Sequence, residues 1–191
     1  MLFVLRKNKQ IVPGVFFIYI LGSFATDCVI IYDAYVSNIV NSTKWLRGFT
    51  LFELAAFSVY FSIVLNSKWF RVFIVIAFVA FLTVFIRHWN STSEKFDSIP
   101  ASIGAIICIL CSLFYLYHTA SDPKRAGKGF INTRFWFAIG ILIYMAGNLF
   151  MFITFNNFKP ADAAKLSAII FPLMNIVKNI FFSIGMLQKE E

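Results

Sequence analysis

The sequence predicts an all-α integral membrane protein, a polytopic bundle of six transmembrane helices with both termini in the cytoplasm. Hydrophobic residues make up 60% of the 191 residues, and charged residues only 14%. The mean hydropathy is +0.78, well above what a soluble domain of this size needs. The apolar residues also gather into runs of roughly 20, the length that crosses a bilayer as a helix.

Six apolar runs give the expected spans in chain order. The first follows Pro13, and polar or charged stretches separate each run from the next. We expect spans over residues 12–36, 49–65, 69–86, 99–117, 135–155 and 166–187, within one integral membrane domain covering residues 1–191. Tryptophan is favoured at membrane interfaces, and all four tryptophans fall at predicted span ends: Trp45, Trp69, Trp89 and Trp136. No internal repeat is visible, so an inverted-repeat transporter is not favoured.

The distribution of lysine and arginine sets the expected orientation, because cytoplasmic segments carry the excess of these residues. The richer set of segments, which we place in the cytoplasm, holds Arg6, Lys7, Lys9, Lys68, Arg71, Lys124, Arg125, Lys128, Arg134 and Lys189. The opposite set holds Lys44, Arg47, Arg87, Lys95, Lys159 and Lys165. We therefore expect a multi-pass membrane protein with both termini in the cytoplasm.

Lys178 is the most unusual residue of the sixth span, since it lies near the middle of an apolar stretch. A charge at that depth costs about 2.5–3.5 kcal/mol on insertion scales, so it is expected to face the bundle interior and meet an acid. Asn175 and Asn179 lie three residues before and one residue after it, which predicts that all three share one helix face.

Acids in the first two spans are the expected partners of Lys178. At 1.5 Å per residue, Asp27 lies roughly 13 Å from the outer end of its span, Lys178 roughly 18 Å and Glu53 roughly 7 Å. Asp27 therefore matches Lys178 best, and Glu53 could complete a triad. The cluster either fixes helix packing as an ion pair or lines a polar cavity that binds a ligand or relays protons.

The fifth span offers further polar groups for the same network. Tyr144 and Asn148 are four residues apart and lie on one helix face. Gly140 and Gly147 on nearby faces would let another backbone come close. The cysteines, Cys28, Cys108 and Cys111, sit in apolar stretches and are expected to be buried small residues, although Cys108 and Cys111 have the spacing of a redox or zinc motif.

Several landmarks together resemble a group of small, uncharacterised bacterial six-span membrane proteins. They read Leu51-Phe-Glu53, Phe135-Trp-Phe137, Gly140-Ile-Leu-Ile-Tyr144, Gly147-Asn-Leu-Phe150 and Asn175-Ile-Val-Lys-Asn-Ile-Phe181. Such proteins look like the membrane sensor halves of histidine kinases without the kinase. The resemblance implies signal perception or partnership with a signalling protein, and it marks Glu53, Asn148, Lys178 and Asn179 as site residues.

Two functions follow as hypotheses. The first is a non-enzymatic sensor or signalling subunit without a cofactor or metal, in which Asp27, Glu53, Tyr144, Asn148, Asn175, Lys178 and Asn179 form the polar centre. The alternative is a small proton- or ion-coupled transporter or channel that uses Asp27, Glu53 and Lys178. A retinal protein and an intramembrane enzyme are weaker alternatives, since the sequence holds six spans and no catalytic motif.

The expected partners follow from charge and location. The formal net charge of +8 suits anionic membrane lipids, whereas no soluble basic surface is expected that could bind nucleic acid. Lys124, Arg125 and Lys128 form the most basic loop, which either sets topology and touches lipid or docks a cytoplasmic partner. A signalling protein of the cytoplasm or membrane and a second copy of the chain are both candidate partners.

Overall fold

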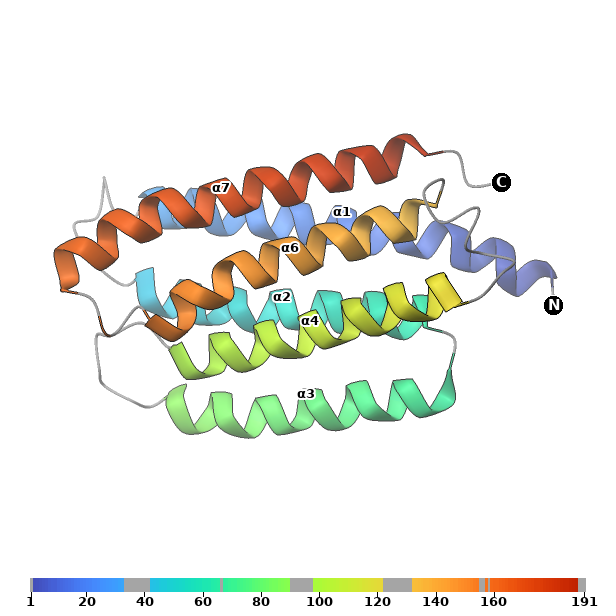
Figure 1. Ribbon diagram of the computed structural model, residues 1–191, viewed down its shortest axis with the longest axis horizontal. Coiled ribbons are helices and arrows are strands. Elements are labelled where there is room, and N and C mark those ends of the chain that lie inside the picture. The colour runs from blue at the N-terminus through green and yellow to red at the C-terminus, as the bar shows by residue number, and fades with distance from the viewer. Residues whose placement is uncertain are drawn as a thin grey trace. The chain divides into compact units, whose positions relative to one another are not determined.

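The computed structural model describes residues 2–32, 42–65, 67–89, 98–121, 132–154, 157 and 159–188. Apart from a few single residues at the helix ends and one 3-10 residue, the described residues are α-helical. The helices are α1 (Leu2–Tyr32), α2 (Ser42–Val64), α3 (Lys68–Trp89), α4 (Ser98–Ser121), α6 (Thr133–Thr154) and α7 (Pro160–Leu187) (Figure 1). The all-α class is therefore confirmed.

Five of these helices are long and apolar enough to cross a membrane. They cover Trp45–Val64, Lys68–Trp89, Ser98–Ser121, Thr133–Thr154 and Lys165–Leu187. In α1, the apolar stretch found among the described residues is Gly14–Val29, which is shorter. The chain thus has the character of a multi-pass membrane protein. All four tryptophans lie at or near helix ends, and Trp69 is 87% exposed.

The chain divides into two compact units, residues Met1–Asp97 and Ser98–Glu191. In the first unit α2 packs against both α1 and α3. Aromatic side chains fill the contact between α1 and α2: the ring centroids of Phe16 and Tyr60 lie 5.0 Å apart, and those of Tyr19 and Phe57 4.9 Å apart. Whether the two units form one membrane domain stays a prediction.

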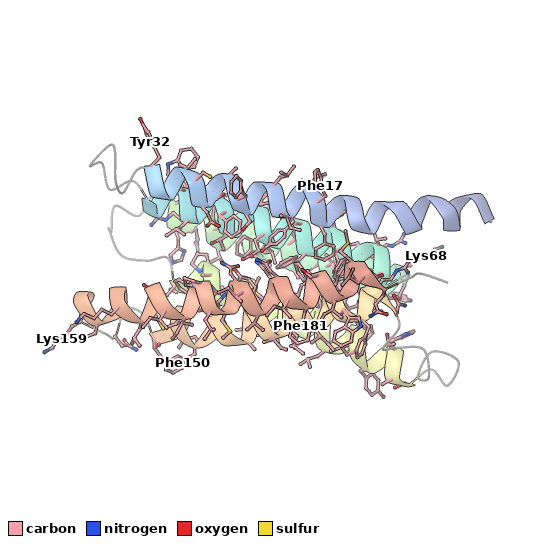
Figure 2. The ribbon with its side chains drawn as sticks, turned by 90° about the horizontal axis from the view of Figure 1, so that it is seen from above. Phe17, Tyr32, Lys68, Phe150, Lys159 and Phe181 are labelled. Carbon is pink, nitrogen blue, oxygen red and sulfur yellow. The ribbon has the colours of Figure 1, made fainter. Side chains whose placement is uncertain are left out.

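Helix α3 buries a single narrow stripe. Its buried residues are Phe70, Ile74, Phe81 and Phe85, spaced by four and seven positions as one helix face requires. Most of the other exposed side chains of α3 are apolar, which is the composition expected for a lipid-facing surface. Phe17 of α1 has the same character: its ring is 63% exposed and stands away from the neighbouring helices of its unit (Figure 2).

The second unit holds α6 between α4 and α7, with which it makes extensive contacts (Figure 1). Small residues make the buried face of α4, so the α6 backbone can come close. They include Ala101, Gly104, Ala105, Cys108, Cys111 and Ser112. The prediction of buried thiols is correct for Cys108 and Cys111 but wrong for Cys28, which is exposed on α1.

Glycines on both helices allow α6 and α7 to approach. A Cβ on Gly140 would lie 3.0 Å from Cβ of Phe181, and one on Gly147 would overlap the side chain of Met174. On α7, a Cβ on Gly185 would lie 2.9 Å from the ring of Phe137. The ring of Phe181, labelled in Figure 2, stacks on Trp136 of α6 at a centroid distance of 5.9 Å. This close contact sets the position of the polar groups described next.

Candidate functional site

Lys178 is buried in the middle of α7, at 1% exposure. Its ammonium Nζ donates a hydrogen bond of 2.7 Å to Oδ1 of Asn175, one turn earlier on the same helix. The same Nζ lies 4.1 Å from the centroid of the Tyr144 ring of α6, which is the geometry of a cation–π contact. The ammonium is thus held by an amide oxygen and an aromatic face from two helices that pack tightly.

Asn148 adds a second amide to this region, and this one is fully buried. It lies one turn after Tyr144 on α6 and is 1% exposed. Among the described residues, its Oδ1 has no hydrogen-bond partner. A buried amide oxygen without a partner costs about 1–3 kcal/mol, so the interior of the second unit holds an acceptor that a donor could satisfy.

We call Tyr144, Asn148, Asn175 and Lys178 the Lys178 cluster. Lysine offers three donors and asparagine offers both donors and acceptors. These groups can hold a polar ligand or a polar side chain of another helix inside an otherwise apolar bundle. They provide charge and hydrogen bonds.

Asn179 does not belong to the Lys178 cluster. The sequence predicted one face for Asn175, Lys178 and Asn179, but the structure buries Lys178, half-buries Asn175 and exposes Asn179. Adjacent helical residues point about 100° apart, so the buried boundary of α7 can fall between Lys178 and Asn179.

The acids predicted for this network belong to the first unit. Glu53 of α2 is buried at 6% exposure, and its Oε1 accepts a 2.6 Å hydrogen bond from the hydroxyl of Tyr19 on α1. Asp27, which was predicted to match Lys178 in depth, is exposed on α1. Within the first unit the structure joins Glu53 to Tyr19, and within the second unit it forms the Lys178 cluster. The pairing of Lys178 with Asp27 or Glu53 stays a prediction.

Tyr19 and Arg47 are polar residues of the interior that the sequence did not single out. Arg47 is buried near the start of α2, and its Nη1 donates to the carbonyl oxygen of Trp89 at the end of α3, at 3.2 Å. The bond satisfies a carbonyl that the last turn of a helix leaves open. Arg47 could have been found from the sequence, because it is a charged residue close to a predicted span end. Nothing in the sequence around Tyr19 indicates its partner.

Lys124, Arg125 and Lys128, the predicted docking residues, lie outside the described part of the chain. No group of three or more His, Cys, Asp or Glu side chains in the described residues is placed to hold a metal ion. No protein-family model, curated protein or solved structure matches the chain.

Proposed function

We propose that the protein is a non-enzymatic sensor or signalling subunit of a bacterial inner membrane. It would have six transmembrane spans, with both termini in the cytoplasm. The observation that carries this proposal is the Lys178 cluster. Ionisable groups inside membrane spans are costly, and they mark functional sites more often than structural ones.

Stability alone does not account for a lysine at position 178. A buried charge is a poor stabiliser compared with an apolar side chain of similar volume. The cation–π contact and the hydrogen bond to Asn175 offset part of its desolvation but also hold it in one geometry. The Oδ1 of Asn148, which has no partner among the described residues, adds recognition capacity.

Transmission to the cytoplasm is the second part of the proposal. A ligand or helix that engages the Lys178 cluster would shift α6 against α7, because Tyr144 and Lys178 lie on different helices. We propose that this shift reaches the basic loop with Lys124, Arg125 and Lys128, where a cytoplasmic or membrane signalling protein would dock. Two-state helix shifts of this kind are an established route for coupling distant sites.

Partner recovery tests this proposal. Cells that express the tagged chain are treated with a mild crosslinker, and the complexes are purified and identified. We expect one signalling protein to be enriched with the wild type and reduced when Lys124, Arg125 and Lys128 are replaced by alanine. Arg134, on the same predicted side, provides the matched control as Arg134→Ala. Recovery of the chain without any enriched partner contradicts the proposal.

A proton- or ion-coupled transporter is the second candidate, and Glu53 is the observation that favours it. A carboxyl group that is buried and bonded to a phenol can take up and release a proton inside a membrane. In this alternative Asp27 and Lys178 would act with Glu53. Proteoliposomes loaded with a pH-sensitive dye separate the two functions: flux that disappears in Glu53→Gln supports transport, whereas the sensor gives no flux above that of empty liposomes.

A further inference from the structure

Asn179 is an exposed amide at the depth of the hydrocarbon core. It lies in the apolar stretch Lys165–Leu187 of α7, about 12 Å from the end at Leu187 and about 21 Å from the end at Lys165. Its side chain makes no hydrogen bond within the part of the chain that the structure describes. Two of its exposed neighbours, Ile176 and Ile180, are apolar.

Such a position is unfavourable for an isolated chain in a membrane. An amide transferred to hydrocarbon without a partner costs several kcal/mol, because lipid tails offer neither donors nor acceptors. Polar side chains on membrane helices are instead satisfied across helix–helix contacts. The exposure of Asn179 therefore indicates a partner helix that covers this face of α7.

The residues around Asn179 repeat with the period of a packed helix pair. One exposed stripe runs along α7 at alternating steps of four and three residues, and we call it the α7 stripe: Pro172, Ile176, Asn179, Ser183 and Met186. Steps of four and three are the pattern of a coiled-coil seam. Ser183 donates to the backbone oxygen of Asn179, so its hydroxyl is satisfied and its small size permits close approach.

We infer that the α7 stripe is the contact between two copies of this chain, with Asn179 of one copy bonded to Asn179 of the other. An asparagine amide carries both donors and an acceptor, so across a two-fold axis it complements its own copy. A lysine or carboxylate at this position would repel its symmetry mate. The stripe carries no such charge, which favours a second copy over a charged partner helix.

This inference does not depend on the proposed function. Lys178 points into the second unit while Asn179 points away from it, so the α7 stripe and the Lys178 cluster lie on different faces of one helix. Loss of the dimer and loss of the Lys178 cluster can therefore be measured separately, with Asn179→Leu and Lys178→Met.

Energy transfer between labelled chains in liposomes tests the contact. The fraction of paired chains is measured as the ratio of lipid to protein is raised, for the wild type and for Asn179→Leu. We expect the dissociation constant to rise about tenfold in Asn179→Leu, as the loss of a membrane hydrogen bond predicts. Asn179→Gln, which keeps the amide, is expected to retain most of the association.

Thr83→Val is the matched control. Thr83 is an exposed polar residue in the span of α3, but its hydroxyl donates to Ala80 of its own helix, so its loss is expected to leave association unchanged. A second measurement places the contact: in a background in which all three native cysteines are replaced by alanine, Ile176→Cys should form a disulfide between copies, and Ile76→Cys on α3 should not.

Three results would overturn the inference. The wild type could remain monomeric at every dilution, Asn179→Leu could associate as tightly as the wild type, or crosslinks could form through α3 instead of α7. Capture of a different membrane protein by the α7 stripe, lost in Asn179→Leu while no pairing between copies is seen, would also exclude the second copy as occupant.

Discussion

The hydrogen bond between Lys178 and Asn175 gives the most quantitative prediction. The bond is 2.7 Å long, its donor is charged, and the donor is 1% exposed. Buried hydrogen bonds to charged groups contribute about 1.5–3 kcal/mol. Asn175→Leu keeps the branched heavy-atom skeleton but removes the acceptor, so we expect it to lower the free energy of unfolding by about 1.5–3 kcal/mol.

A double-mutant cycle isolates this contribution from the effect of the leucine itself. In the Lys178→Met background there is no ammonium to satisfy, so Asn175→Leu is expected to cost less than about 0.5 kcal/mol. The free energies are measured by reversible unfolding in mixed detergent micelles, with circular dichroism as the readout. Dilute micelles that hold one chain each keep association out of the measurement.

Asn179→Leu is the matched control for this cycle. It replaces an asparagine four positions further along the same helix, but its side chain is exposed and makes no bond to Lys178 within the described residues. We expect a change within about 0.5 kcal/mol in single-chain micelles. Equal costs of Asn175→Leu in the presence and absence of Lys178 would refute the assignment of this bond.

Three further predictions concern packing, the first unit and topology. The methyl group added in Gly185→Ala would lie 2.9 Å from an aromatic ring and should lower the free energy of unfolding by about 1–3 kcal/mol. Gly48→Ala, whose methyl group would have nothing within 4 Å, should raise it by about 0.5–1 kcal/mol. Thermal unfolding of both variants measures the two changes. Tyr19→Phe removes the hydrogen bond to Glu53 and should cost about 1–3 kcal/mol, while Tyr117→Phe at an exposed site should be neutral in the same assay. A fluorescent protein fused to the C-terminus should fluoresce and alkaline phosphatase fused there should be inactive; the opposite pattern contradicts a cytoplasmic C-terminus.

The helices were predictable because burial in lipid demands long apolar runs, and the sequence shows them directly. Their ends were less predictable. Helix α2 begins at Ser42, before the predicted span start at residue 49, and α7 begins at Pro160, before the predicted span start at residue 166. Apolar runs mark only the hydrocarbon part of a helix, whereas the helix continues into the polar interface. Proline at the first turn of α7 also suits a helix start.

The candidate site was predictable in part. The burial of Lys178 follows from the cost of its charge, and Asn175 and Tyr144 were singled out by spacing. The exposure of Asn179 could not be predicted. Residues one, three and four positions apart share only a broad arc of the helix surface, and the sequence does not show where the buried part of that arc ends. Tyr19 was missed because its partner Glu53 lies on another helix, at a distance in sequence that no local pattern encodes.

The function of the Lys178 cluster is tested most directly by the amount of signalling partner recovered with Lys178→Met. Cells are crosslinked, and the partner is quantified per folded chain for the wild type, Lys178→Met and the control Thr83→Val. Our proposal predicts at least a tenfold loss of partner for Lys178→Met and no loss for Thr83→Val. Equal recovery with all three chains would contradict it, since the cluster would then serve packing alone.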